Sequence, residues 1–219
     1  GVLLPGPPPQ SFPQTELLDL CQQITGATGV TMALEGVYRW IVFLPSTQQA
    51  GRPVPNRYFG VFTDGSLKYR GLMCRRRDTP PLVRQAQEAL LAALAQVENW
   101  EAGRARWQEL QDAADDYRLR LREGQVRPRD LVITKVLSRP LDQFKVATHT
   151  ALAARQLQAA GVRIVPGEKL RYLVRERHGP PETRVLAAPF FDDLDCYDTD
   201  YYLELLAKAV DEVLWPWLG

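Results

Sequence analysis

The order of apolar and polar residues predicts a β-rich first part of the chain. Alternating apolar positions favour strands at 30–35 and 37–44. Farther on, two arms rich in β-branched and aromatic residues meet at Asp64-Gly65 and predict a β-hairpin within 54–78. An Asp-Gly pair suits such a hairpin because it tolerates the positive φ angles of a tight turn.

Helical periodicity governs most of the remaining chain. Thr15 is a suitable N-cap for a short helix that Gly26 ends, and Thr79 for a second helix in which Pro80 takes the first position. Proline is tolerated there because its missing N–H would lack a helical partner anyway. Helices are expected at 15–25, from 79 to the apolar residues near 94, and at 100–122, 147–160 and 198–214; further strands are expected at 131–134, 169–177 and 184–189.

Together these elements predict an α+β fold, with a mostly β part at 1–78 and a mostly helical module carrying a small β-hairpin at 79–219.

Hydrophobic residues make up 45% and charged residues 24%, as in ordinary globular proteins. The net charge is only +1, so a nucleic-acid surface must come from local clusters of cations. We expect no membrane partner, because no apolar run approaches the roughly 20 residues of a membrane span.

The sequence offers no self-sufficient catalytic constellation. Cys21, Cys74 and Cys196 are far apart and lack metal-ligand spacing, which is typical of reduced thiols in an intracellular protein. His149 and His178 have no neighbouring ligands, and no glycine-rich phosphate loop is present. The acidic residues of 112–116 favour a solvated helix face over a metal site.

Basic and aromatic residues gather on the predicted hairpin. They are Arg57, Tyr58, Lys68, Tyr69, Arg70 and the run Arg75-Arg76-Arg77. Cations and rings on a stiff sheet edge can contact phosphates and a nucleic-acid groove. A solvated hairpin without a partner is the alternative interpretation.

Six segments resemble, in order, the motifs of one enzyme family. Residues 34–38 resemble L-E-x-x-Y, 56–58 stand in the place of K-K-x-Y, and 71–78 resemble R-G-[IL]-E-x-x-R-R-D. Residues 137–145 resemble I-T-R-x-L-x-x-Y-K, 161–174 resemble G-x-x-[IV]-x-P-G followed by Y-[IV]-V, and 197–204 resemble Y-D-x-x-Y-Y-[IL]-E. On these motifs the chain resembles the C-terminal end of a family B DNA polymerase, comprising the last part of the palm (1–78) and the whole thumb (79–219).

The last of these segments also imitates the catalytic motif of this family. Tyr197-Asp198-Thr199-Asp200 looks like Y-x-D-T-D, whose aspartates bind metal on a β-hairpin. Here helical periodicity follows, so we interpret Asp198 and Asp200 as residues at a helix N-terminus, where carboxylates favour the unpaired N–H groups. The catalytic aspartates, the fingers and the exonuclease of the family all precede the position of Gly1, and the residues from Gly1 to Leu4 are expected to leave the aspartate hairpin as a strand.

The resemblance therefore implies the small C-terminal piece of a split or fragmentary DNA-directed DNA polymerase. We expect it to grip primer–template duplex DNA, to be inactive alone, and to complete the palm of a larger piece that carries the exonuclease, the fingers, the catalytic aspartates and the Mg²⁺ ions. Two-metal phosphoryl transfer requires carboxylates that this chain does not supply. The expected location is cytoplasmic, with the nucleoid.

The resemblance also names expected DNA contacts. Arg57 and Tyr58 match minor-groove and primer-side contacts, with Asn56 in place of a family lysine. Arg76 and Arg77 match phosphate contacts or palm braces. Further expected contacts are Lys68 on the hairpin and Ser138, Arg139, Lys145 and Lys169 in the thumb. Thr79 stands where the family often has Trp or Tyr, so packing there is expected to differ.

Other interpretations remain open at this stage. Arg76 or Arg77 can instead form a salt bridge with Asp78 or Glu35, and His149 favours a structural hydrogen bond at a helix start over a DNA contact. The whole chain can be a non-catalytic duplex-binding protein derived from a polymerase. The basic hairpin can also serve as a docking surface for RNA or protein.

Overall fold

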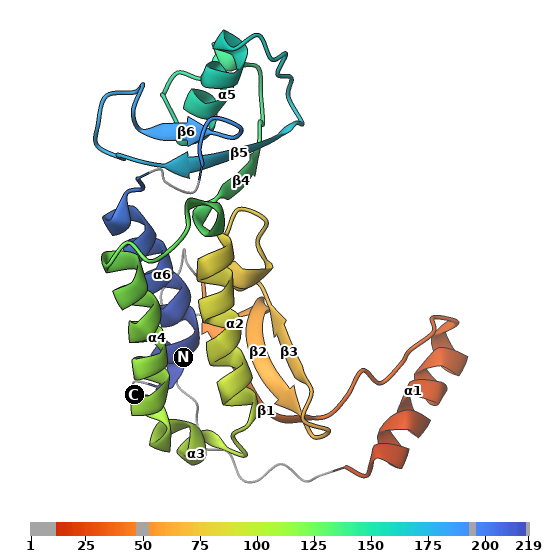
Figure 1. Cartoon of the computed structure of the whole chain (residues 1–219). Helices are drawn as coiled ribbons and strands as arrows, with labels where there is room; N and C mark the ends of the chain where they lie inside the picture. Colours follow the sequence, from red (N-terminus) through yellow and green to blue (C-terminus); the bar gives the residue numbers. More distant parts are fainter. Residues whose placement is uncertain (1–11, 47–52, 193–195, 218–219) are drawn as a thin grey trace.

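A computed structural model describes residues 12–46, 53–192 and 196–217 and shows an elongated molecule (Figure 1). Three helices form its centre: α2 (Pro81–Ala95), α4 (Trp107–Arg122) and α6 (Thr199–Leu214). A first sheet packs beside α2, and we call this sheet and the helices together the body. A second sheet and α5 (His149–Ala159) form a tip at the other end, within residues 128–192.

The first sheet contains the predicted hairpin. Its antiparallel strands lie in the order β1 (Tyr38–Pro45), β2 (Pro53–Phe62) and β3 (Leu67–Arg70). At the turn between β2 and β3, Gly65 has a φ of 86°, and the carboxylate of Asp64 accepts a hydrogen bond from Ser66 N at 2.8 Å. The turn at Asp64-Gly65 is therefore confirmed.

The strand predicted at 30–35 is wrong. Residues 31–37 are irregular, and β1 is paired with β2 alone among the described strands. Alternating apolar residues produce a strand only where a neighbouring strand completes the hydrogen bonds of the ladder. The expectation for residues 1–4 lies outside the described residues.

Two helices begin or end at residues other than the predicted ones. The first helix, α1, runs over Gln14–Thr28 with Pro13 at its N-cap, so Thr15 lies inside the helix and does not cap it. The helix ends at Gly29, whose φ is 71°, so Gly26 also lies inside it. The α2 helix begins after Pro80 rather than Thr79. Thr79 is buried, and its hydroxyl donates to Met73 O at 2.6 Å, so it fixes the preceding 3₁₀ turn η1 (Met73–Arg75) instead of capping the helix.

The remaining helices follow the predicted pattern closely. The block at 100–122 is divided at Arg106 into α3 (Trp100–Ala105) and α4. Thr148 caps α5 through a hydrogen bond from Ala151 N, and Asp198 caps α6 through one from Tyr201 N. Asp198 is thus confirmed as a helix-terminal residue.

The tip holds a second antiparallel sheet. Its strands are β4 (Ile133–Val136), β5 (Lys169–Val174) and β6 (Val185–Ala187), in that order, and the short helix η2 (Pro128–Leu131) precedes β4. Strand β4 begins two residues later than predicted because η2 occupies the start of the expected range. Two further short helices are η3 (Leu141–Gln143) and η4 (Trp215–Trp217).

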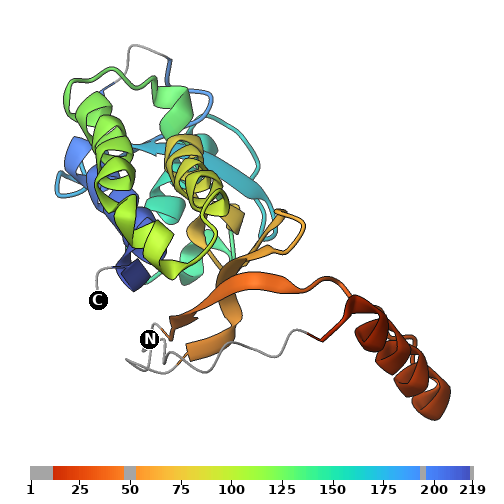
Figure 2. The same cartoon turned by 90° about the horizontal axis from the view of Figure 1, so that it is seen from below.

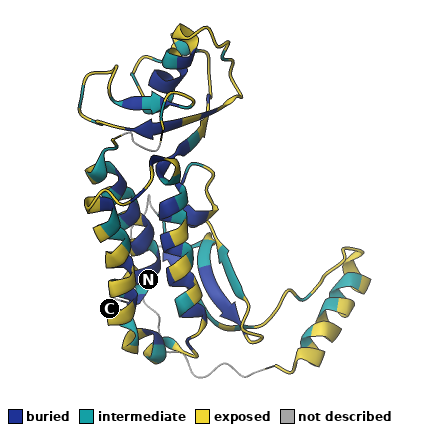
Figure 3. Cartoon of the chain, viewed as in Figure 1, coloured by how far each residue is buried: buried dark blue, intermediate teal, exposed yellow. Residues whose placement is uncertain are grey.

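One hydrophobic core joins the sheets and the central helices. Phe59 of β2, Leu91 of α2, Tyr202 of α6 and Leu173 of β5 all belong to it and are fully buried. Figure 3 shows the buried faces of α2 and α6 turned toward each other, whereas α1 contains no buried residue. Figure 2 shows α1 projecting away from the body. The α+β fold class is confirmed, and none of the described helices is long and apolar enough to cross a membrane.

Candidate nucleic-acid interface

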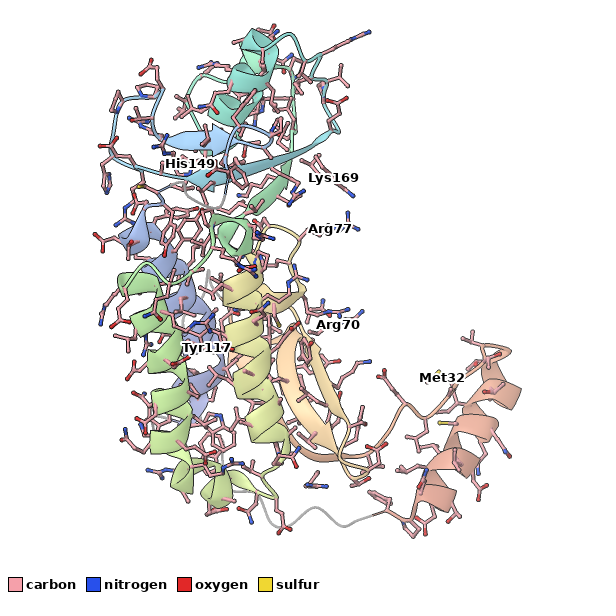
Figure 4. The ribbon with its side chains drawn as sticks, viewed as in Figure 1. Met32, Arg70, Arg77, Tyr117, His149 and Lys169 are labelled. Atoms are coloured by element: carbon pink, nitrogen blue, oxygen red, sulfur yellow. The ribbon has the colours of Figure 1, made fainter. Side chains whose placement is uncertain are left out.

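Three exposed cations from separate elements point to one side of the molecule. They are Arg70 at the end of β3, Arg77 after η1 and Lys169 at the start of β5 (Figure 4). Their side chains form no ion pair or hydrogen bond with any other described residue. This side of the molecule therefore has positive charge available to an external anion along both the body and the tip.

Two more predicted residues share the outer face of the first sheet. Tyr58 is the cross-strand partner of Arg70, and Asn56 lies two residues earlier on β2, which places it on the same face. The ring of Tyr58 lies 6.4 Å from that of Tyr38 and 5.7 Å from that of Phe43, measured between centroids. Burial and the neighbouring Tyr58 raise the pKa of Tyr38 to about 12, so its phenol stays neutral at physiological pH.

Arg57 points to the opposite face of β2, toward the central helices. Side chains alternate along a strand, so Arg57 lies on the face that carries the buried Phe59. Its guanidinium donates to Glu212 Oε1 at 2.7 Å and to Pro45 O at 2.8 Å. In this structure Arg57 is therefore engaged inside the body, unlike the minor-groove contact that the motif implies.

Glu212 is the centre of a polar cluster around this ion pair. Its second oxygen accepts hydrogen bonds from Met73 N at 2.9 Å and from Gln87 Nε2 at 3.0 Å. Gln87 is fully buried, and its own oxygen accepts from Cys74 N at 2.6 Å. The cluster thereby fixes η1, whose last residue begins the run of three arginines, to α2 and α6.

Besides Arg57, two predicted contacts form ion pairs with carboxylates. Arg76 donates from Nε and Nη2 to the two oxygens of Asp78 at 3.1 and 3.0 Å, which is the alternative considered for this arginine. Glu35 pairs with Lys68 rather than with an arginine. Arg77 therefore differs from both Arg76 and Lys68, since it has no partner among the described residues.

The other predicted contacts lie on exposed segments of the tip. Ser138, Arg139 and Lys145 follow β4, and the guanidinium of Arg139 lies 5.4 Å from the centre of the Phe144 ring. Leu137 exchanges backbone hydrogen bonds with Glu168 and Gly167 at 2.9 and 2.8 Å. These bonds place the segment with Ser138 and Arg139 beside the loop that leads to Lys169.

His149 packs against rings at the start of α5. Its imidazole centroid lies 5.6 Å from the ring of Tyr201 and 6.4 Å from that of Tyr172. Burial, with help from the charges of Arg184 and Lys135, lowers the pKa of His149 below its ordinary value. A structural role is thus supported, although through ring contacts rather than the expected hydrogen bond.

The aspartates that imitate the catalytic motif take part in the helix start. Asp198 accepts hydrogen bonds from Tyr201 N and from Arg177 N, both at 2.8 Å, while Asp200 is exposed in the first turn of α6. Within the described ranges, no group of three or more His, Cys, Asp and Glu residues could hold a metal ion.

Sequence reasoning missed one basic residue near this side. Lys135 of β4 lies 3.5 Å from Asp78, which joins the tip to the body. Lys135 lies two positions after the buried Ile133, on the same face of β4, so strand alternation gave no sign that its side chain is exposed. Its partner Asp78 lies 57 positions earlier in the chain, so no local sequence pattern indicated this pair.

Comparison with known structures first defines the fold. The chain is similar to the family B DNA polymerase of the archaeon Pyrobaculum calidifontis, with a TM-score of 0.63 and 21% sequence identity over 89% of this chain and 24% of that one. At this identity the likeness establishes a shared fold.

Sequence comparison then gives the family. The model of DNA polymerase family B matches residues 55–216, and the chain belongs to this family. It is 30% identical to a DNA polymerase of Pyrococcus horikoshii over 72% of this chain and 12% of that protein. It is 28% identical to DNA polymerase 2 of Aeropyrum pernix over 80% of this chain and 20% of that protein. The chain thus spans a fifth or less of the length of these two relatives.

Proposed function

We propose that this chain is the C-terminal part of a DNA-directed DNA polymerase and that it holds the duplex formed during synthesis. Residues through 78 belong to the palm and those from 79 to the thumb. The observation that carries this proposal is the set of exposed cations on one side of a family B fold, Arg70, Arg77 and Lys169, which extends from body to tip.

The chemistry of this side suits a duplex of any sequence. Arginine and lysine contact backbone phosphates, which every sequence presents alike. Tyr58 and Asn56, on the outer sheet face beside Arg70, can contact the minor groove, whose acceptors are nearly the same for all base pairs. At the tip, Ser138, Arg139, Lys145 and Lys169 hold the backbone farther along the duplex.

Nucleotide addition in this proposal requires a larger part of the polymerase, on the same or another chain. That part carries the exonuclease, the fingers and the aspartates that hold Mg²⁺, and this chain alone does not extend a primer. The edge of β1 that no described strand covers supports a large contact with that part, of the roughly 2,000 Å² or more typical of obligate interfaces.

The test is the salt dependence of duplex binding by this chain. Arg70→Ala, Arg77→Ala and Lys169→Ala are each expected to weaken binding and to reduce the slope of log K against log salt by about 0.9, which corresponds to one phosphate contact. Arg122→Ala is the matched control, because this exposed cation belongs to α4, on the other side of α2 from the first sheet (Figure 1).

Two results separate the alternatives. A folded chain that does not bind duplex DNA at low salt contradicts the proposal. A chain that binds duplex but does not restore primer extension to the rest of a polymerase supports the non-catalytic duplex-binding protein instead.

A further inference from the structure

One carboxylate at the junction of body and tip engages two basic side chains. Asp78 lies just before α2, and its two oxygens accept the paired N–H groups of Arg76 at 3.1 and 3.0 Å. The ammonium of Lys135, on β4 of the tip, lies 3.5 Å from one of these oxygens. Asp78 therefore connects the turn after η1 to the first strand of the tip.

Arg76 and Lys135 are arranged as in a phosphate-binding site, and the carboxylate of Asp78 occupies the place of the phosphate. An arginine presents two parallel N–H groups equally well to the oxygens of a carboxylate or a phosphate. The side chains of Arg76 and Lys135 are 58% and 47% exposed, whereas that of Asp78 is 24% exposed. Solvent therefore reaches both cations more readily than it reaches the carboxylate between them.

The charges around Asp78 leave room for a second anion. Two cations share one carboxylate, and Arg77 beside them has no partner among the described residues. Burial alone would raise the pKa of Asp78, but the hydrogen bonds and charge of Arg76, together with the charge of Lys135, bring it below the ordinary value. The carboxylate is thus ionised at neutral pH, where it competes with any phosphate for the same donors.

We propose that Asp78 is an internal competitor of duplex DNA: a backbone phosphate of the bound duplex takes over Arg76 and Lys135, and Asp78 thereby weakens the grip. The exchange breaks and forms ion pairs only. Before DNA arrives, Asp78 keeps both cations ordered at the junction. The inference rests on the proposed function, since it needs a duplex on this side of the molecule.

The experiment compares two substitutions of equal charge. Asp78→Asn keeps the shape of the side chain and removes its charge. Asp115→Asn makes the same change on α4, where Asp115 pairs with the single Arg118 away from this side. Binding of a labelled DNA duplex is followed by fluorescence anisotropy between about 50 and 200 mM salt, the range over which phosphate contacts dominate the affinity.

Asp78→Asn is expected to bind duplex about three- to five-fold more tightly, since ion pairs of this exposure hold their partners by up to about that factor. Its slope against salt should steepen by about 0.9 for each phosphate contact strengthened. Asp115→Asn should stay within about two-fold of the unchanged chain, because its charge lies outside the short screening distance. Equal or weaker binding by Asp78→Asn, or an equal gain in both variants, overturns the inference.

Further variants keep the test decisive. The gain from Asp78→Asn should disappear when Lys135→Ala and Arg76→Ala are added. If circular dichroism shows that Asp78→Asn is not folded, Lys135→Ala alone is measured: a slope reduced by about 0.9 supports the inference and an unchanged slope overturns it. Failure of the unchanged chain to bind duplex would reject the proposed function itself, whereas binding without any gain in Asp78→Asn rejects this inference alone.

Discussion

Arg57 and Glu212 are 155 positions apart in the sequence, and their side chains form a 2.7 Å ion pair between the hairpin and the last helix. Both are mostly buried, with side chains 20% and 18% exposed. The pair thus connects the start of the family match to its end, and it places the hairpin against α6 before any ligand binds.

Replacement of Glu212 should therefore cost much stability. Glu212→Ala leaves a mostly buried guanidinium, the N–H of Met73 and one N–H of Gln87 without their acceptor. We expect the free energy of unfolding to fall by about 2–4 kcal/mol, as for other groups that lose a buried charged partner. Urea denaturation measures this change.

The matched control is Glu204→Ala on the same helix. Glu204 is 55% exposed and pairs with Arg177 alone at 2.7 Å, so its loss should cost less than about 1 kcal/mol. Equal costs for the two substitutions would contradict the central role of Glu212.

A second prediction concerns the close contact of α3 with the end of the chain. A Cβ at Gly103 would overlap the ring of Trp217, which stacks on Trp100 with centroids 4.1 Å apart. Gly103→Ala should destabilise the fold by about 1–3 kcal/mol through overpacking and should change tryptophan fluorescence. Gly26→Ala is the control, since nothing lies within 4 Å of its Cβ and alanine favours the helix, so stability should stay equal or rise.

The third prediction tests Asp198 as a cap. Asp198→Ala removes the acceptor of the backbone N–H groups of Tyr201 and Arg177 and should cost about 1–2 kcal/mol in thermal denaturation. Asp200→Ala, an exposed change in the same turn, should cost little beyond its favourable charge at the helix start. If both substitutions leave stability unchanged, the cap contributes nothing.

A fourth prediction concerns pH. The folded protein lowers the pKa of His149 chiefly by burial, so between the folded pKa and the ordinary value of 6.5 the unfolded chain binds more protons. Stability due to this group is therefore complete above pH 6.5 and decreases as the pH falls below it. The urea midpoint should fall from pH 7 to pH 5, values that bracket the ordinary histidine pKa of about 6.5.

His149→Gln should reduce this pH dependence, because glutamine does not titrate. His178→Gln, at an exposed residue of the same tip, should retain it. The same decrease in all three proteins would assign the effect to other groups.

Local chemistry accounts for what could be predicted from the sequence. The Asp64-Gly65 turn, the cap at Asp198 and the helix end at Gly161 depend on neighbours a few positions away, and all are present in the structure. The predicted strand at 30–35 failed because a strand depends on a partner elsewhere. Thr79 failed as a cap because its hydroxyl found the carbonyl of Met73, in the turn before the helix.

The candidate site shows the same limit more strongly. The basic residues of the hairpin are visible in the sequence, but which of them stay available depends on distant partners. Glu212 engages Arg57, Glu35 engages Lys68 and Asp78 engages Lys135. Tertiary contacts thus decide which cations remain for an external anion, and no local pattern contains that information.

The projecting helix α1 has a consequence for amide hydrogen exchange. None of its residues is buried, so its hydrogen bonds open without disturbing the core that protects α2 and α6. A helix of 15 residues is close to the length at which isolated helices are marginal in water. Its amides should exchange by local fraying, whereas those of the central helices should exchange only on global unfolding. The chain therefore contains two regions whose amides exchange with different free energies of opening.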